Sequence, residues 1–188
     1  MKKINNNVIL TIGILLFLTS LKFDSQINLI LKNIRFPIFD AVFGIITNFG
    51  VVLFIALVIP SIILYKKNRK SVYLLWLTFI VSVILAFIIK LIILRQRPIG
   101  AFAYPLINII NYSFPSMHSM AVFSLLPVLI KHLPKQKSFW AIFALLVAFS
   151  RIYFGFHFFS DVIFGAFVGY FVGDFLLELH GKNKLWIN

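Results

Sequence analysis

Three short polar clusters, whose residue types suit the binding of a phosphate group, stand in order along an otherwise apolar chain of 188 residues. They are Lys90 with Arg97-Pro98, then Pro115-Ser116-Met117-His118, and then Ser150-Arg151 with His157 and Asp161. Cations, histidines and carboxylates are costly in a membrane span unless they are paired, hydrated or placed at the interface. Their gathering in three clusters therefore predicts a functional site.

The first cluster pairs two cations. Lys90 and Arg97 are seven residues apart, which is close to two turns of an α-helix. This spacing predicts that both side chains lie on one helix face, and Pro98 would help to end the helix beyond them. Two cations in this arrangement can bind one anion. The alternative interpretation is a basic helix end whose side chains snorkel toward water.

The second cluster predicts a helix start beside a histidine. Ser116 follows a proline and precedes an apolar run, as an N-cap residue does. The free N–H groups of the next residues, Met117 among them, and the positive helix end would then lie close to His118. Such an arrangement can bind a phosphate. A capping serine and an interfacial histidine also occur for structural reasons alone, so this cluster by itself is a weak signal.

The third cluster pairs a histidine with a carboxylate. His157 and Asp161 are four residues apart, so on a helix the carboxylate could hold one imidazole nitrogen and leave the other as a nucleophile. Arg151 would face away from His157 on one continuous helix, and Gly155 could supply the break that brings them together. In the alternative interpretation, Asp161 only caps the last helix and His157 is an interfacial aromatic residue.

Composition sets the class of protein that must position these clusters. Hydrophobic residues make up 61% of the sequence and charged residues 12%, and the apolar runs are too long for a soluble core. We expect an all-α integral membrane protein with a single membrane-embedded domain over residues 1–188. The absence of cysteine excludes a thiolate nucleophile and a thiolate metal site. The sequence has no soluble module in which basic and aromatic residues alternate, so we do not expect nucleic-acid binding.

Hydropathy predicts a bundle of six transmembrane helices. The six spans cover about residues 8–21, 43–65, 72–93, 118–133, 139–154 and 161–180. The first span has the basic start of a signal peptide but no small-residue cleavage pattern, so we expect it to remain as an anchor. From Ile27 to Val42, apolar residues recur at near-helical spacing among charged ones. This segment predicts an interfacial helix between the first two spans.

The distribution of basic residues predicts the orientation. With a cytoplasmic N-terminus, the inner segments hold eleven of the 18 basic residues: Lys2, Lys3, Lys66, Lys67, Arg69, Lys70, Lys131, Lys135, Lys137, Lys182 and Lys184. The positive-inside rule therefore favours a multi-pass protein of the cell membrane with both termini in the cytoplasm. All three polar clusters then fall on the extracytoplasmic side. The basic residues of these cytoplasmic segments also account for most of the formal net charge of +13.

Together the clusters resemble the type 2 phosphatidic acid phosphatase superfamily, the membrane relatives of vanadium haloperoxidases. The family pattern is Lys, six residues, Arg-Pro, then Pro-Ser-Gly-His, then Ser-Arg, five residues, His, three residues, Asp. It is met at Lys90, Arg97, Pro98, Pro115, Ser116, His118, Ser150, Arg151, His157 and Asp161. One position departs from the pattern, because Met117 stands where the family usually has glycine.

The resemblance implies a mechanism through a phosphohistidine. His157 would attack phosphorus, Asp161 would orient it, and His118 would protonate the leaving oxygen and later activate water. The phosphate-binding residues would be Lys90, Arg97, Ser116, Met117 and Arg151. These cations make a metal ion unnecessary, and we expect no cofactor. The chain has only five Asp and Glu residues, too few in the clusters for a two-metal phosphatase.

A site at the outer interface among apolar helices predicts a lipid substrate. We expect a lipid phosphate monoester or a prenyl diphosphate, of the phosphatidate, phosphatidylglycerophosphate or undecaprenyl diphosphate type, and no obligate protein partner. Two alternatives stay open. The same phosphohistidine could pass its group to a second lipid, which would make the protein a phosphotransferase. The protein could also bind or transport phospholipid without catalysis, although binding alone needs no histidine paired with a carboxylate.

Overall fold

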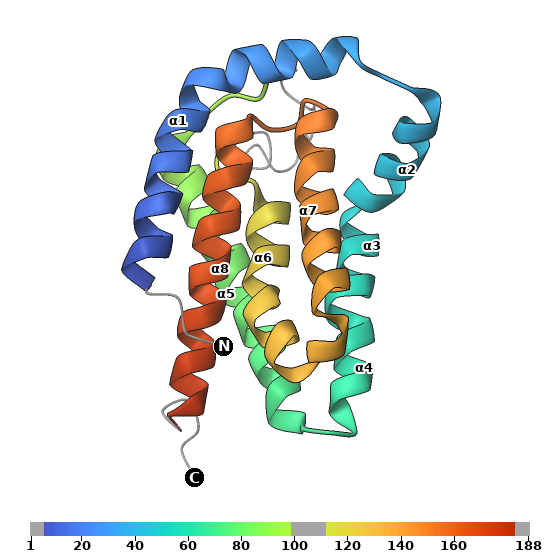
Figure 1. Cartoon of the computed structure of the whole chain (residues 1–188), viewed down its shortest axis with the longest axis vertical. Coiled ribbons are helices and arrows are strands. Elements are labelled where there is room, and N and C mark those ends of the chain that lie inside the picture. The colour runs from blue at the N-terminus through green and yellow to red at the C-terminus, as the bar shows by residue number, and fades with distance from the viewer. Residues whose placement is uncertain (1–5, 99–111, 183–188) are drawn as a thin grey trace.

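A computed structural model describes residues 6–98 and 112–182, and these residues form a helical bundle (Figure 1). In chain order the helices are α1 (Asn6–Asn33), α2 (Pro37–Thr47), α3 (Phe49–Leu53), the π-helix η1 (Phe54–Val58), α4 (Ile59–Tyr65), α5 (Arg69–Ile93), α6 (Met117–His132), the 3₁₀ turn η3 (Pro134–Gln136), α7 (Lys137–Tyr153) and α8 (Phe159–Gly181). The predicted cytoplasmic Lys2, Lys3 and Lys184 lie outside the described residues.

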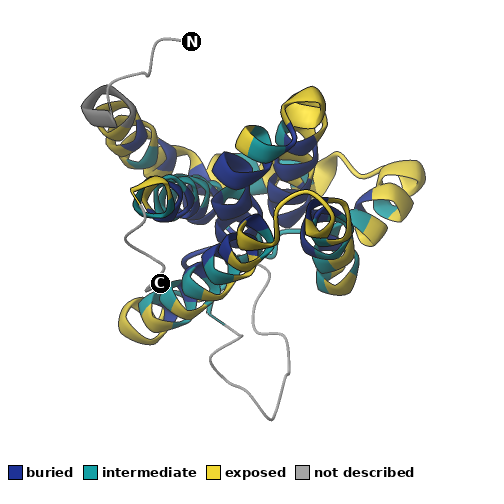
Figure 2. Cartoon of the chain, turned by 90° about the horizontal axis from the view of Figure 1, so that it is seen from below, coloured by how far each residue is buried: buried dark blue, intermediate teal, exposed yellow. Residues whose placement is uncertain are grey.

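The bundle is apolar on its outer surface, as expected of a protein surrounded by lipid. Figure 2 shows exposed residues around the outside of the helices and buried residues toward the centre. Large apolar side chains are exposed along several helices, up to 70% for Ile92. Exposing so much apolar surface to water would be strongly unfavourable. The prediction of an all-α integral membrane protein is therefore confirmed.

The number of spans remains a prediction. Among the described residues, three helical segments are long and apolar enough to cross a membrane, namely 10–33, 69–93 and 159–181. The bent pair formed by 37–47 and 49–65 gives a fourth if it is counted as one span, and α6 is shorter. The helices α5, α6, α7 and α8 begin and end within three residues of the predicted spans.

The N-terminal region differs from its prediction. The segment from Ile27 to Val42 is not one interfacial helix, because α1 continues to Asn33 and α2 begins at Pro37. Phe36 has extended backbone angles, φ −128° and ψ 135°, as expected of a residue whose helical conformation clashes with the next proline. In Figure 1 the second half of α1 runs across one end of the bundle.

The predicted span 43–65 is bent. Helix α2 meets the helical run from Phe49 to Tyr65 at 60°. The break lies at Asn48, which has extended backbone angles and whose side chain accepts a hydrogen bond from the backbone N–H of Val51 at 3.3 Å. An asparagine in this role starts a new helix, so hydropathy alone could not place the bend. The bend puts Thr47 near the end of α7, where it contacts Arg151.

Three glycines fix the start of α6 against α8. A Cβ atom at Gly165, Gly169 or Gly173 would lie 2.7, 2.3 or 2.0 Å from a backbone oxygen of α6 or of its N-cap residue. Only glycine allows the two backbones to approach so closely, and the four-residue spacing puts all three on one helix face. This packing holds the start of α6 beside the start of α8, where the polar clusters meet.

Candidate active site

One pocket of about 540 Å³ brings most of the predicted site residues together; we call it the phosphate pocket. It is lined by Thr47, Asn48, Phe49, Lys90, Arg97, Met117, His118, Arg151, Phe156 and His157. Six of the eight predicted site residues are among these ten. The two others, Ser116 and Asp161, lie behind the pocket wall and are fully buried.

The turn between α7 and α8 brings His157 next to Arg151. Helix α7 ends at Tyr153, and Gly155 follows with φ 68°, in the left-handed region that favours glycine. The carbonyl oxygen of Arg151 then accepts hydrogen bonds from the N–H groups of Phe156 at 3.0 Å and His157 at 3.2 Å. The predicted break at Gly155 is confirmed. His157 lies before α8, so the prediction that it shares a helix face with Asp161 is wrong.

The imidazole of His157 is held by a backbone carbonyl. Its Nδ1 atom is 2.7 Å from the carbonyl oxygen of Ser113. A carbonyl only accepts hydrogen bonds, so Nδ1 carries the proton and Nε2 has a lone pair in the neutral ring. The carboxylate of Asp161 is 3.7 Å from Nδ1, which is too long for a hydrogen bond. The carbonyl of Ser113 therefore takes the hydrogen bond predicted for Asp161, whose carboxylate remains within ion-pair distance of the ring.

The surroundings of His157 keep the ring neutral. Burial lowers the pKa of the His157 imidazole well below 6.5, and the positive charges of Lys90, Arg97 and Arg151 lower it further. Its Nε2 atom lies 3.3 Å from Nη1 of Arg97. At neutral pH the ring therefore presents a lone pair to the phosphate pocket, beside a cation that can bind a phosphate oxygen.

The three cations of the pocket reach it from different elements. Nζ of Lys90 donates to the carbonyl oxygens of Tyr112 at 2.6 Å and Ser113 at 3.3 Å. Nη1 of Arg97 donates to the carbonyl oxygen of Phe156 at 2.6 Å. Arg151 donates to the hydroxyl and carbonyl oxygens of Thr47. Three positive charges around one pocket suit a phosphate group.

The first cluster does not lie on one helix face as predicted. Helix α5 ends at Ile93, and Leu94 has φ 52° in the left-handed region, so Arg97 lies beyond the helix. Pro98 would allow the helix to continue as far as Arg97, but α5 ends four residues earlier. Lys90 and Arg97 still face the same pocket, because the segment after Leu94 turns Arg97 toward the α7–α8 turn.

The second cluster starts α6 as predicted. Ser116 is the N-cap residue of α6, and its hydroxyl oxygen accepts hydrogen bonds from the N–H and the hydroxyl of Ser119. Its side chain is thus engaged in capping and does not line the pocket. Met117 lines the pocket from the first turn of α6. Among the described non-glycine residues only Leu94 has a positive φ, so the backbone at position 117 does not require glycine.

His118 lies against Phe49 and lines the same pocket as His157. The two rings of His118 and Phe49 meet edge to face with centroids 4.9 Å apart. The Nε2 atom of His118 is buried and makes no hydrogen bond with any residue in the described ranges. A buried ring nitrogen of this kind lacks the partner that such groups normally have. A leaving oxygen or a water molecule in the pocket could be that partner.

A second group of charges, which the sequence did not predict, lies behind the pocket. Arg95 donates to the carboxylates of Asp24 and Asp161 at 2.8 Å each. Asp24 also accepts hydrogen bonds from the N–H and hydroxyl of Ser160, while Asp161 accepts one from the N–H of Phe158. We call Asp24, Arg95, Ser160 and Asp161 the buried charge network. It ties α1 to the start of α8 and to the segment after α5.

One signal in the sequence could have found this network. Asp24 is one of only five acidic residues, and it stands in an apolar helix where an unpaired carboxylate is costly. As for metal ligands, no three His, Asp or Glu side chains gather around one point in residues 6–98 and 112–182. The chemistry that the site itself supplies is thus a neutral imidazole, a second buried imidazole and three cations around a space that fits a phosphate.

Comparison with known proteins gives the family. The family model of the PAP2 superfamily matches residues 71–185, which include all three polar clusters. The chain belongs to this superfamily. Phosphatidylglycerophosphatase B of Bacillus subtilis (strain 168) is 34% identical over 161 residues, covering 78% of this chain and 77% of the relative. Undecaprenyl-diphosphatase of Sulfolobus acidocaldarius is 29% identical over 129 residues, covering 66% of this chain and 62% of the relative.

Two solved structures share the fold of this PAP2 protein. A transmembrane PAP2-type phosphatidylglycerolphosphate phosphatase from Bacillus subtilis superposes with a TM-score of 0.72 at 26% identity, covering 94% of this chain and 98% of that one. LpxE from Aquifex aeolicus superposes with a TM-score of 0.65 at 25% identity, covering 83% of this chain and 95% of that one. The predicted resemblance to the superfamily is therefore confirmed.

Proposed function

We propose that this PAP2 protein hydrolyses the terminal phosphate of a membrane lipid through a phosphohistidine at His157, on the extracytoplasmic side of the membrane. The chain is a phosphoric ester hydrolase that acts on lipids, as its family and the lipid phosphatases among its relatives indicate. One observation carries the mechanism. The lone pair of His157 Nε2 faces a pocket with three cations, because Nδ1 donates to Ser113.

The first step forms a covalent intermediate. Nε2 of His157 attacks phosphorus, so a P–N bond forms while the bond from phosphorus to the leaving oxygen breaks. The lipid oxygen leaves with the bonding electron pair and takes a proton from Nε2 of His118. Lys90, Arg97 and Arg151 neutralise the charge on the remaining phosphate oxygens as the transition state develops. A bound phosphate also favours the protonated form of His118, because its negative charge offsets these cations.

The second step releases phosphate. Water attacks the phosphorus of the phosphohistidine and gives a proton to His118, while the P–N bond breaks and its electron pair returns to Nε2 of His157. The products are inorganic phosphate and the dephosphorylated lipid, and both histidines recover their starting states. Asp161 acts at a distance of 3.7 Å, where its negative charge stabilises the positive imidazole ring of the intermediate.

Hydrolysis of a panel of lipids tests this function. Purified protein should release phosphate from at least one of phosphatidate, phosphatidylglycerophosphate and undecaprenyl diphosphate. Because cations of the chain bind the phosphate, activity should survive excess EDTA, and vanadate should inhibit by mimicking the transition state. Complete loss of activity on chelation, restored by Mg²⁺, would contradict the metal-independent mechanism. Transfer of label to an acceptor lipid instead of water would identify a phosphotransferase.

The proposed side of the membrane rests on the charge distribution. The basic segments 66–70 and 131–137 lie at one end of the bundle, and the α7–α8 turn, whose Phe156 and His157 line the phosphate pocket, lies at the other end (Figure 1). The positive-inside rule puts the basic loops in the cytoplasm. Since the chain has no cysteine, a single Cys at exposed Asn33 or Asn68 can be probed without background. In intact cells an impermeant maleimide should label position 33 and spare position 68, and the reverse pattern would put the site in the cytoplasm.

A further inference from the structure

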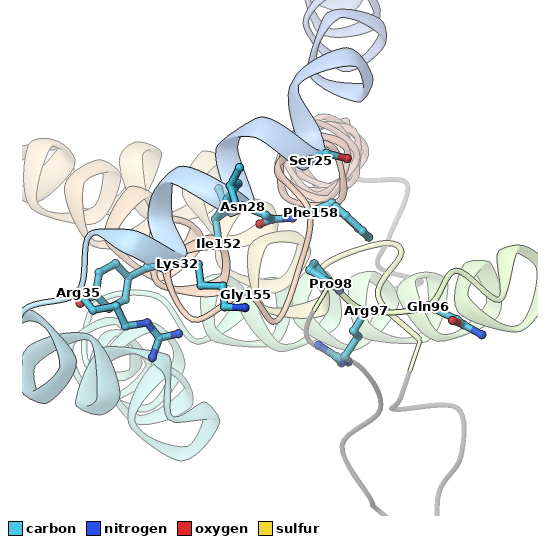
Figure 3. A pocket seen from close by; sticks show the side chains of 12 residues that line it. Ser25, Asn28, Lys32, Arg35, Gln96, Arg97, Pro98, Ile152, Gly155 and Phe158 are labelled. Carbon is cyan, nitrogen blue, oxygen red and sulfur yellow. The ribbon is translucent and has the colours of Figure 1, made fainter.

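A second pocket of about 950 Å³ lies beside the phosphate pocket and shares Arg97 with it. Figure 3 shows that the second half of α1, with Asn28 and Lys32, and the segment after it, with Arg35, form one side, and that Arg97 reaches the pocket from another side. The α7–α8 turn, including Gly155, separates the two pockets. The two pockets therefore meet at the side chain of Arg97.

The second pocket is positively charged. Its lining in the described part of the chain includes Lys32, Arg35 and Arg97 and no Asp or Glu. The guanidinium of Arg35 lies 5.6 Å from the ring centre of Tyr153 and 5.4 Å from that of Phe154, within the range of cation–π contacts. These contacts favour a defined position for Arg35 beside the pocket. Like charges gathered without a carboxylate favour an anionic ligand.

A buried amide in the same pocket lacks a partner. Both the nitrogen and the oxygen of the Asn28 side chain are buried, and neither makes a hydrogen bond with the residues that the structure describes. A buried amide without partners destabilises the folded protein, so such groups normally have a hydrogen-bond partner. A ligand that both donates and accepts hydrogen bonds, as a hydroxyl group does, would satisfy Asn28.

We propose that the second pocket binds the part of the substrate head group that lies next to the reacting phosphate. This part would carry a second phosphate, bound by Lys32 and Arg35, across a hydroxylated linker bound by Asn28. The inference rests on the proposed function, since it puts the reacting phosphate in the phosphate pocket. It makes the protein selective for lipids with two phosphates separated by a polyol over lipids with a single phosphate.

The ratio of two kcat/KM values tests this selectivity. The substrates are phosphatidylglycerophosphate, which has the second phosphate and the glycerol linker, and phosphatidate, which has neither. The ratio should favour phosphatidylglycerophosphate, and it should fall about tenfold in the double variant Lys32→Met/Arg35→Met. The matched control is Lys22→Met, which removes an exposed charge from α1 outside the pocket lining. An unchanged ratio in the double variant, or an equal fall in the control, would overturn the proposal.

A second variant separates binding from folding. Asn28→Leu removes the unpartnered amide, so it should raise the thermal stability of the protein without substrate and yet lower the same kcat/KM ratio. A variant that is merely misfolded would lose stability. If Asn28→Leu is more stable and the ratio does not change, the amide does not bind substrate and the proposal is wrong.

Binding to the His157→Ala protein distinguishes this inference from the proposed function. If the wild-type protein hydrolyses none of the lipids in the panel, including undecaprenyl diphosphate, the proposed function fails, and the ratio of the two Kd values in His157→Ala still tests the second pocket. That ratio should favour phosphatidylglycerophosphate and should fall in the Lys32→Met/Arg35→Met background. If this background instead weakens only the binding of inorganic phosphate, the pocket takes a free anion, which would also overturn the proposal.

Discussion

Two sets of charged residues, the phosphate pocket and the buried charge network, lie at the same end of the bundle, and the oxygens that accept hydrogen bonds from their cations differ in charge. In the phosphate pocket the hydrogen-bond acceptors of the three cations include backbone carbonyls and one hydroxyl, and Arg97 also lies 3.3 Å from Nε2 of His157. In the buried charge network Arg95 donates to two carboxylates, those of Asp24 and Asp161. A cation bound to neutral oxygens keeps its charge for a ligand, whereas a cation between carboxylates is neutralised. The first group is thus suited to bind substrate and the second to hold helices together.

Replacing the proposed nucleophile of the phosphate pocket should give the largest loss of activity. His157→Ala removes the atom that forms the intermediate, so kcat should fall on the order of 10⁴-fold or more. The variant should still insert into the membrane and bind substrate, because the cations remain. Phosphate release and a lipid-binding assay on the same preparation measure both properties. Hydrolysis at a near-normal rate would exclude His157 as the nucleophile.

Replacing the second histidine should give a smaller and more specific loss. His118→Ala should lower kcat by about 10²- to 10⁴-fold for a lipid alcohol leaving group, which needs a proton. A substrate with an acidic leaving group, such as an aryl phosphate, needs no proton, and its first step should recover part of the rate. Burst kinetics separate the two steps. Equal losses for both leaving groups would count against His118 as the acid.

The buried charge network should respond mainly through stability. Arg95→Met leaves the carboxylates of Asp24 and Asp161, whose side chains are 5% and 0% exposed, without their cation. The free energy of unfolding should fall by about 3 kcal/mol. Lys182→Met is the control, because it breaks an exposed 2.8 Å ion pair with Glu178 and should cost about 0–1 kcal/mol. Unfolding in detergent measures both, and equal effects would remove the distinction between buried and exposed pairs.

The smallest effect concerns the protonation of His157. Its titration midpoint in the free protein should lie below pH 6.5, because burial and three cations disfavour the charged ring. Nitrogen NMR of histidine-labelled protein measures it, and His157→Asn identifies the signal among four histidines. Lys90→Met removes one neighbouring positive charge and should raise the midpoint. A midpoint at or above pH 6.5 in the wild-type protein would mean that the pocket does not hold the ring neutral.

Local patterns were sufficient to predict most helices and most pocket residues. The helices α5 to α8 follow hydropathy, and motif spacing identified six residues that line one pocket. The predicted hydrogen-bond partner of His157 was wrong because the actual partner is a backbone carbonyl, 44 residues away in sequence. A backbone carbonyl has no residue-type signature. Likewise, Arg95 and Arg97 are two residues apart and look alike in the sequence. Their roles differ because Arg95 contacts two carboxylates that are distant in sequence, those of Asp24, 71 residues away, and Asp161, 66 residues away.

The breaks in the N-terminal half were missed for a related reason. Hydropathy averages over a window, so it does not register one capping residue such as Asn48 or the effect of Pro37 on Phe36. The close packing of α8 on α6 was encoded locally, by glycines at 165, 169 and 173. That spacing is visible in the sequence and would have predicted that one face of α8 packs closely against another helix.

The stereochemical course at phosphorus tests the covalent intermediate most directly. A lipid ester of an isotopically chiral thiophosphate can be hydrolysed by the wild-type protein, and the configuration of the released thiophosphate determined. Two successive in-line displacements, first by His157 and then by water, predict retention of configuration. Inversion would mean that water attacks the lipid phosphate directly, and it would contradict a phosphohistidine at His157.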